Sequence, residues 1–201
     1  MIDSITEVIK ARLGIGSGAT YPLVEVLSNV DNQVYKVRAL PDRQQAADLI
    51  ARIRIRLAKF TEHLEKTYPD KSQVQRMVKN FKAEPRRFLE STPDAAHTSY
   101  SVNKGEQIHL CLRQRKGGDE SLVNEEVMMF VSLHELAHSI TQTIGHGPDF
   151  WNNFGWILKE AENNGFYKHQ NFAAQPVSYC GVSITDQPRY NPEKDDGFVD
   201  Y

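Results

Sequence analysis

Cysteine is scarce in this chain of 201 residues, which contains only Cys111 and Cys180. Two cysteines build neither a disulfide-rich scaffold nor a Cys-x-x-Cys metal site, so we expect two free thiols in a reducing compartment. Long apolar runs are also absent, since no stretch approaches the roughly 18 consecutive apolar residues of a membrane-spanning helix. Asp3 and Glu7 stand where a signal peptide would carry positive charge. The sequence therefore predicts an intracellular protein, cytoplasmic or nuclear, that makes no use of a membrane.

A strong excess of one charge is lacking as well. The chain has 24 Lys and Arg against 26 Asp and Glu, and its formal net charge is -2. This balance excludes a protein that is basic throughout, in the manner of a histone. The charge is unevenly distributed, however, because residues 36–92 are rich in Lys and Arg while residues 186–201 are acidic. We expect the acidic stretch to be a mobile tail.

Hydrophobic periodicity and turn residues predict the elements along the chain. We expect helices over 3–13, 42–69, 72–83, 122–144 and 148–164. Strands are expected over 33–40, 98–102 and 107–115, the last two as a hairpin that turns at Asn103 to Gly105.

The chemistry is concentrated in the sequence HELAH, at residues 134–138. His134 and His138 are four residues apart on a predicted helix, so their side chains lie on one face and can bind one metal ion. Glu135 is the next residue round the helix and can act as a general base without ligating the metal. The neighbouring residues are mostly apolar, which predicts a buried helix.

A catalytic zinc site needs a third protein ligand and an open position. His146 is our first choice, because it follows His138 by eight residues and comes directly after Gly145, where the chain can turn back. The alternative is a glutamate of the next helix, Glu160 or Glu162. The longer motif HExxHxxGxxH does not apply, since Thr141 and Ile144 occupy its last two defining positions.

HELAH, a further histidine and then GPDFW resemble the WLM and SprT-like zinc metallopeptidases. The preceding IHLCLRQR resembles the strand before the active-site helix of WLM domains, and VYKVRALPDRQQAADLI resembles their opening strand and helix. The resemblance covers roughly residues 33–165. It implies a main domain over 33–165, with an N-terminal helix and loop over 1–32 and a C-terminal extension over 166–201. It implies a compact α+β zincin-type domain, minimal and gluzincin-like, with a small sheet packed on the HExxH helix. It also implies one zinc ion, peptide-bond hydrolysis, and substrates bound to DNA or conjugated to ubiquitin-like proteins.

We therefore expect a zinc-dependent metalloprotease that acts on proteins, with Glu135 as its base and His134, His138 and His146 as zinc ligands. Strand 107–113 is the expected rail for an extended substrate, which could pair with its free edge. The expected substrate-binding residues on one face of that strand are His109, Cys111 and Arg113. The candidates for stabilising the oxyanion are Tyr167, His169 and Tyr179.

Two other functions stay open. The protein could be an inactive binding module that keeps zinc as a structural clip, or a DNA-associated protein that uses its basic 52–87 region. The basic residues concerned are Arg52, Arg54, Arg56, Lys59, Arg86 and Arg87, and the solvated face of an amphipathic helix explains them better. Cys180 could inhibit as a zinc-binding thiolate, but a buried structural cysteine is favoured. Core packing beneath the metal helix is the favoured interpretation of Phe150, Trp151 and Trp156.

Overall fold

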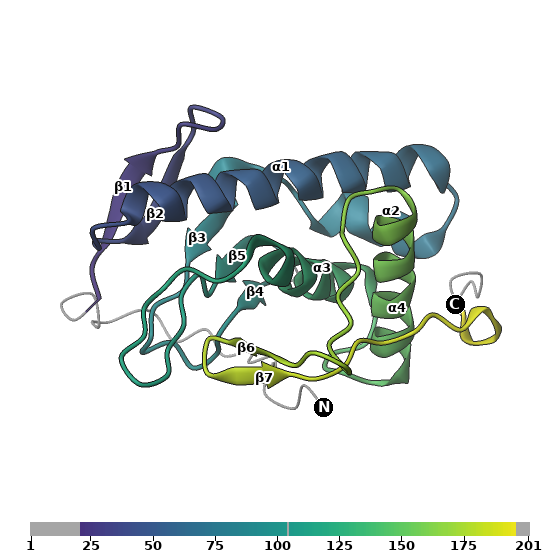
Figure 1. The fold of residues 1–201 in the computed structure, drawn as a ribbon. Coiled ribbons are helices and arrows are strands. Elements are labelled where there is room, and N and C mark those ends of the chain that lie inside the picture. The colour runs from purple at the N-terminus through teal and green to yellow at the C-terminus, as the bar shows by residue number, and fades with distance from the viewer. Residues whose placement is uncertain (1–20, 104, 196–201) are drawn as a thin grey trace.

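The structure is a computed structural model that describes residues 21–103 and 105–195 (Figure 1). In these ranges the chain forms four α-helices, a five-stranded sheet and a separate two-stranded sheet. The expected α+β fold, with a small sheet packed on the helix that carries HELAH, is confirmed. The helix expected over 3–13 lies outside the described residues.

The observed elements follow most of the predicted ones closely. The helices are α1 (Arg43–Thr67), α2 (Ser72–Asn80), α3 (Glu125–Ile140) and α4 (Pro148–Asn163). The strands are β1 (Leu23–Leu27), β2 (Val34–Arg38), β3 (Phe88–Glu90), β4 (Tyr100–Val102), β5 (Gln107–Leu110), β6 (Val177–Tyr179) and β7 (Val182–Ile184). Short 3₁₀ turns lie at Pro85–Arg87 and Pro192–Lys194. Strands β1, β3, β6 and β7 were not predicted.

The five strands of the main sheet run in the order β1-β2-β3-β5-β4. Strand β3 is parallel to β2 and to β5, whereas β1 and β4 are antiparallel to their neighbours. Strand β5 therefore lies inside the sheet, with hydrogen-bonded neighbours on both sides. The prediction that strand 107–113 offers a free edge is wrong, and the described edge on this side is β4.

Helix α1 lies along the molecule and covers the sheet on the side next to α3 (Figure 1). Its predicted apolar stripe is confirmed, because every member of the stripe is buried. The stripe consists of Leu49, Ile53, Leu57, Phe60 and Leu64. The opposite face of α1 carries charged residues, and none of the described helices has the length and apolar character needed to cross a membrane.

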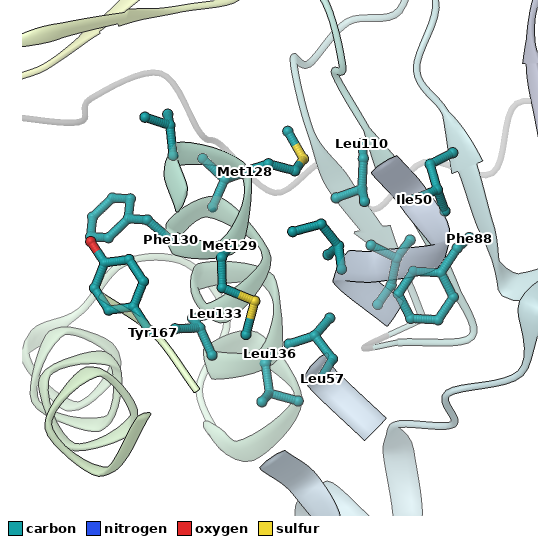
Figure 2. Packing of buried hydrophobic residues seen from close by; sticks show 14 of the residues in the cluster. Ile50, Leu57, Phe88, Leu110, Met128, Met129, Phe130, Leu133, Leu136 and Tyr167 are labelled. Atoms are coloured by element: carbon teal, nitrogen blue, oxygen red, sulfur yellow. The ribbon is translucent and has the colours of Figure 1, made fainter. Parts of the chain in front are cut away.

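Helix α3 is the central element of the core. Asn124 caps its first turn, accepting hydrogen bonds from the backbone N–H groups of Glu126 and Val127. From Val127 to Ile140 every residue is buried. Figure 2 shows Leu136 next to Leu57 of α1, while Phe130 turns the other way, toward Tyr167. The helix is thus enclosed on several sides, which explains its nearly continuous apolar sequence.

The C-terminus of α3 comes earlier than predicted, at Ile140 rather than Ile144. Two side chains of α2 bind its last carbonyl groups: Arg76 Nε donates to Ile140 O at 2.7 Å and Asn80 Nδ2 donates to Ser139 O at 3.0 Å. These bonds satisfy carbonyls that the end of a helix leaves without intrahelical partners. Gly145, at φ +89°, turns the following loop instead of capping the helix.

The two cysteines form a disulfide, so the prediction of two free thiols is wrong. Cys111 follows β5 and Cys180 lies in the turn between β6 and β7, 69 residues later in the sequence. Gln114 strengthens the attachment, since its Nε2 donates to Ser178 O and its Oε1 accepts from the Cys180 N–H. The inference of a reducing compartment loses its basis with this bond.

The described part of the acidic tail is packed rather than mobile. Residues 186–195 cross α4 at Gly155, where an added Cβ would lie 2.7 Å from the backbone of Arg189 and leave no room for a side chain. Further on, Asp195 forms a buried ion pair with Lys71 at 2.6 Å and accepts a hydrogen bond from the Tyr190 hydroxyl. Composition alone missed these contacts, because they are made with distant parts of the chain.

Reduction of the disulfide is expected to destabilise the protein. In the chain-entropy description, a crosslink between residues 69 apart restricts the unfolded chain by about 4 kcal/mol. Urea unfolding with and without a reducing agent measures the difference. A Cys111→Ser/Cys180→Ser double variant should match the reduced protein and show no response to reductant. Two titratable free thiols in the protein purified without reductant would contradict the assignment.

Candidate metal centre and active site

His134 and His138 lie one helical turn apart on α3. Both are buried, with exposed fractions of 0% and 6%, and their ring centroids are 5.0 Å apart. The four-residue spacing places both side chains on one face of the helix. Because α3 is enclosed and capped at both ends, this pair has little freedom to move.

His146 joins this pair from the loop between α3 and α4. Its Nε2 lies 3.2 Å from Nε2 of His134, and its ring centroid lies 5.0 Å from that of each of the other histidines. The loop turns at Gly145 and is held to α4 by Thr143, whose hydroxyl donates to Asp149. The ligand atoms of His134, His138 and His146 all lie within 4.8 Å of one another.

The geometry of the three imidazoles fits a metal ion. Two nitrogens bound tetrahedrally at the usual zinc–nitrogen distance lie about 3.4 Å apart, and the observed Nε2 to Nε2 distance is 3.2 Å. Three neutral imidazoles with an open fourth position are one of the ligand sets of catalytic zinc. Among the described residues this is the one group of three such ligands that is brought together.

The electrostatics favour the form of His134 that can bind a metal. Burial lowers the pKa of His134 well below its usual value, and the neighbouring His138 and His146 lower it further. A neutral imidazole has a lone pair on one ring nitrogen, whereas a protonated imidazole has none. Burial therefore keeps His134 ready to act as a ligand at neutral pH.

Aromatic rings of α4 surround the histidines. Phe150 stacks on His138 at a centroid distance of 4.4 Å, and Trp151 stacks on His146 at 5.5 Å. Phe150 is fully buried, as core packing predicted, but Trp151 is only partly buried. Both rings restrict the orientation of the imidazoles, a role that periodicity alone did not reveal. Trp156 is a core residue that packs on Tyr68.

Glu135 is 2% exposed and faces away from the solvent, next to His134 on α3. Tyr179 of β6 lies close enough to Glu135 for the carboxylate to affect the pKa of the tyrosine. Burial chiefly raises the pKa of Tyr179, and the charge of Glu135 raises it further. The Tyr179 hydroxyl is 2.5 Å from Ser99 Oγ, which accepts a hydrogen bond from the Cys111 N–H. The β6–β7 hairpin and the segment before β4 are thereby connected beside Glu135.

The three oxyanion candidates have different surroundings. Tyr179 is near Glu135 but is 1% exposed, so its hydroxyl is not on an open surface. Tyr167 is buried against Phe130. His169 is exposed and pairs with Glu162 at 2.9 Å. Among the described residues, neither Tyr167 nor His169 belongs to the group formed by the three histidines.

The alternative third ligands lie elsewhere. Glu160 accepts a hydrogen bond from Tyr68 at 3.0 Å, and Glu162 pairs with His169. Neither belongs to the group formed by the three histidines. The geometry therefore favours His146 as the partner of His134 and His138.

The residues expected to bind substrate on strand 107–113 are already engaged within the protein. Cys111 is in the disulfide, and Arg113, 2% exposed, pairs with Glu90 at 2.8 Å and also with Asp42. These two side chains are unavailable to a substrate, which corrects the prediction. His109 is partly exposed but stacks on Tyr100 of β4, and burial lowers its pKa to about 4.

The basic residues of α1 are largely paired within the molecule. Arg52 and Arg56 form ion pairs with Glu125, and Arg54 forms one with Asp31. Arg86 and Arg87 pair with Glu84. These carboxylates reduce the charge available to phosphate groups, and the DNA-binding role of the 52–87 region stays a prediction.

Several supporting residues escaped the sequence analysis. Arg76 and Asn80 hold the end of α3, Thr143 holds the loop of His146, and Ser99 connects β6 to the residue that follows β5. Of these contacts, only the one between Thr143 and Asp149 joins residues that are close in the sequence.

Comparison with known proteins identifies relatives over most of the chain. A family model described as the WLM domain matches residues 32–196. Protein R325 of Acanthamoeba polyphaga mimivirus is 31% identical over 163 residues, which are 80% of this chain and 82% of that protein. Protein 136R of Invertebrate iridescent virus 6 is 36% identical over 69 residues, which are 34% of this chain and 38% of that protein. Both are described as uncharacterized.

Crystal structures of Wss1 from Saccharomyces cerevisiae and of a Wss1 mutant are 25% identical to this chain with a TM-score of 0.44. They match 64% of this chain and 90% and 89% of their own chains, the mutant having the larger share. The family model alone matches well over half of the sequence. This chain belongs to the WLM domain family.

Proposed function

We propose that this protein is a zinc-dependent metallopeptidase that hydrolyses peptide bonds of protein substrates. The observation that carries the proposal is the convergence of His134, His138 and His146 within 4.8 Å, with Glu135 on the same buried helix. Membership of the WLM domain family supports it. In this proposal the three histidines hold the metal and leave one position open toward the substrate.

The residues of the chain have separate roles in the proposed reaction. Bound zinc supplies Lewis-acid polarisation of the substrate carbonyl and makes water easier to deprotonate. Glu135 accepts the proton of the attacking water and later gives it to the amine nitrogen of the leaving group. Phe150 and Trp151 keep the imidazoles of His138 and His146 in position. Proton transfer in the proposed reaction thus depends on one carboxylate of α3.

Strand β4 is the proposed docking edge for an extended substrate. It lies at the edge of the described sheet, pairs only with β5 within it, and contacts α3. A sheet edge offers unpaired N–H and C=O groups, to which a peptide can add as one more strand. This assignment moves the proposed rail from strand 107–113 to Tyr100–Val102.

Zinc binding is expected to depend on His146. Wild-type protein should bind about one zinc per chain, because three imidazoles complete the ligand set. His146→Ala should bind at least about 100-fold more weakly, since loss of even an outer-shell partner costs 10–100-fold. Competition with a chromogenic chelator measures the affinity. His169→Ala is the matched control and should bind as wild type does; equal affinity in His146→Ala would contradict the assignment.

Replacing Glu135 should separate catalysis from metal binding. Glu135→Gln should keep its zinc but lose about 10²–10⁴-fold of its cleavage rate, because the amide accepts no proton. Casein cleavage followed by mass spectrometry provides the rate, and Glu162→Gln is the control carboxylate. If the wild-type protein holds zinc yet cleaves nothing, the zinc-clipped binding module replaces the proteolytic function. An undiminished rate in Glu135→Gln would refute the role of Glu135 as base.

A further inference from the structure

Among the described residues, the guanidinium group of Arg115 is hydrogen-bonded to uncharged acceptors only. Its Nη2 donates to three uncharged acceptors, Ser91 O at 3.3 Å, Ser91 Oγ at 3.0 Å and Thr92 O at 3.0 Å. Among the described residues no carboxylate lies within ion-pair distance of Arg115, and its Nε and Nη1 make no hydrogen bond. By contrast Arg38, Arg54, Arg56 and Arg113 each pair with a carboxylate.

The surroundings place Arg115 beside the proposed active site. The preceding Gln114 bonds the backbone of Ser178 and Cys180, so this segment lies against the β6–β7 hairpin. The charge of Arg115 acts on Tyr179, which is also the tyrosine that responds to Glu135. It also acts on Tyr100 of the edge strand β4, whose pKa it lowers against the larger raising effect of burial. The charge of Arg115 thus reaches a tyrosine near the general-base candidate and a tyrosine of the proposed docking edge.

The charge of Arg115 is incompletely compensated. The side chain is partly buried, and burial lowers its pKa, while the nearby charge of Arg38 lowers it further. Glu90 and Asp94 act on it only at longer range, and both oxygens of Glu90 are engaged by Arg38 N–H and Arg113. Desolvation of a charge is costly unless a partner of opposite charge is near. A carboxylate supplied from outside would provide that partner and could accept two hydrogen bonds from the guanidinium.

We propose that Arg115 determines specificity by binding a carboxylate of the peptide substrate, close to the bond that is cut. The inference rests on the proposed peptidase function and names the substrates that this function favours. The guanidinium is held in advance by Ser91 and Thr92, so little rotamer entropy is lost on binding. The carboxylate belongs either to an Asp or Glu side chain or to a peptide C-terminus.

Binding to the inactive protein tests the proposal without catalysis. Fluorescent alanine-based peptides with an internal Glu, or with Gln at the same place, are titrated into zinc-loaded Glu135→Gln, and a third peptide has Gln and a free C-terminal carboxylate. At least one carboxylate peptide should bind about tenfold more tightly than the amidated Gln peptide, as expected for a charge-assisted hydrogen bond. The preferred one identifies the source of the carboxylate. Equal binding of all three would overturn the proposal.

Arg115→Gln in the same background should abolish the preference, and Arg189→Gln, which alters an exposed arginine, should preserve it. Thermal melting verifies that the variants fold. If Arg115→Gln does not fold, Arg115→Lys decides, because lysine keeps the charge but loses the two-pronged geometry and should weaken the preference. A preference that survives unchanged in the folded variant would overturn the proposal.

Cleavage-site profiling distinguishes this inference from the proposed function. Mass spectrometry of casein digested by the wild type should find Asp, Glu or a C-terminus at one fixed distance from the cuts, and Arg115→Gln should lose this enrichment. Cuts without such enrichment would overturn the role of Arg115 while leaving the peptidase intact. Absence of all cleavage, together with a carboxylate preference in the binding assay, would overturn the peptidase and retain the Arg115 site.

Discussion

The burial of His134, Glu135 and His138 in an apolar interior is the constraint on which the rest of the structure depends. Polar groups removed from water cost free energy unless other groups compensate them. Here burial keeps the imidazole of His134 neutral, which avoids the much larger cost of a buried cation. His146 brings its Nε2 to 3.2 Å from that of His134. The burial that keeps His134 neutral therefore also leaves it in the form that can bind a metal together with His138 and His146.

Such a group of side chains keeps its geometry only if the helix that carries it is held firmly. Asn124 caps the start of α3, while Arg76 and Asn80 of α2 bind the carbonyls at its end. Arg56 of α1 pairs with the acidic first turn, at Glu125 and Glu126. Helices α1 and α2 thus support the site although neither contributes a ligand.

The features that were predicted correctly from the sequence are those that depend on local patterns of residues. The stripe of α1, the HELAH spacing and the start of α4 at Pro148 each depend on residues within a few positions of one another. The convergence of His146 was also foreseen, because Gly145 allows a turn directly before it. These elements and the three histidines are the part of the site that sequence reasoning can reach.

Features that depend on distant residues could not be read in the same way. Strand β3 has three residues and forms only because β2 and β5 flank it. Cys111 and Cys180 form a disulfide although they are 69 residues apart, and Asp195 forms an ion pair with Lys71, which is far from it in the sequence. Neither pairing leaves a periodic trace in the sequence. Composition suggested free thiols and a mobile tail, whereas long-range contacts form the disulfide and hold residues 186–195, the described part of that tail.

The segment after β5 shows why alternation misled the search for substrate contacts. Alternation over 107–113 placed His109, Cys111 and Arg113 on one face of the strand, but the ladder of β5 ends at Leu110. Beyond that point the side chains no longer alternate between two faces. Cys111 is bonded to Cys180, and Arg113 is buried and pairs with Glu90. Two residues further on, Arg115 is the side chain whose charge is left for a partner from outside. In our proposal, recognition of substrate on this segment therefore falls to Arg115, because Cys111 and Arg113, which lie nearer to β5, are engaged in contacts within the fold.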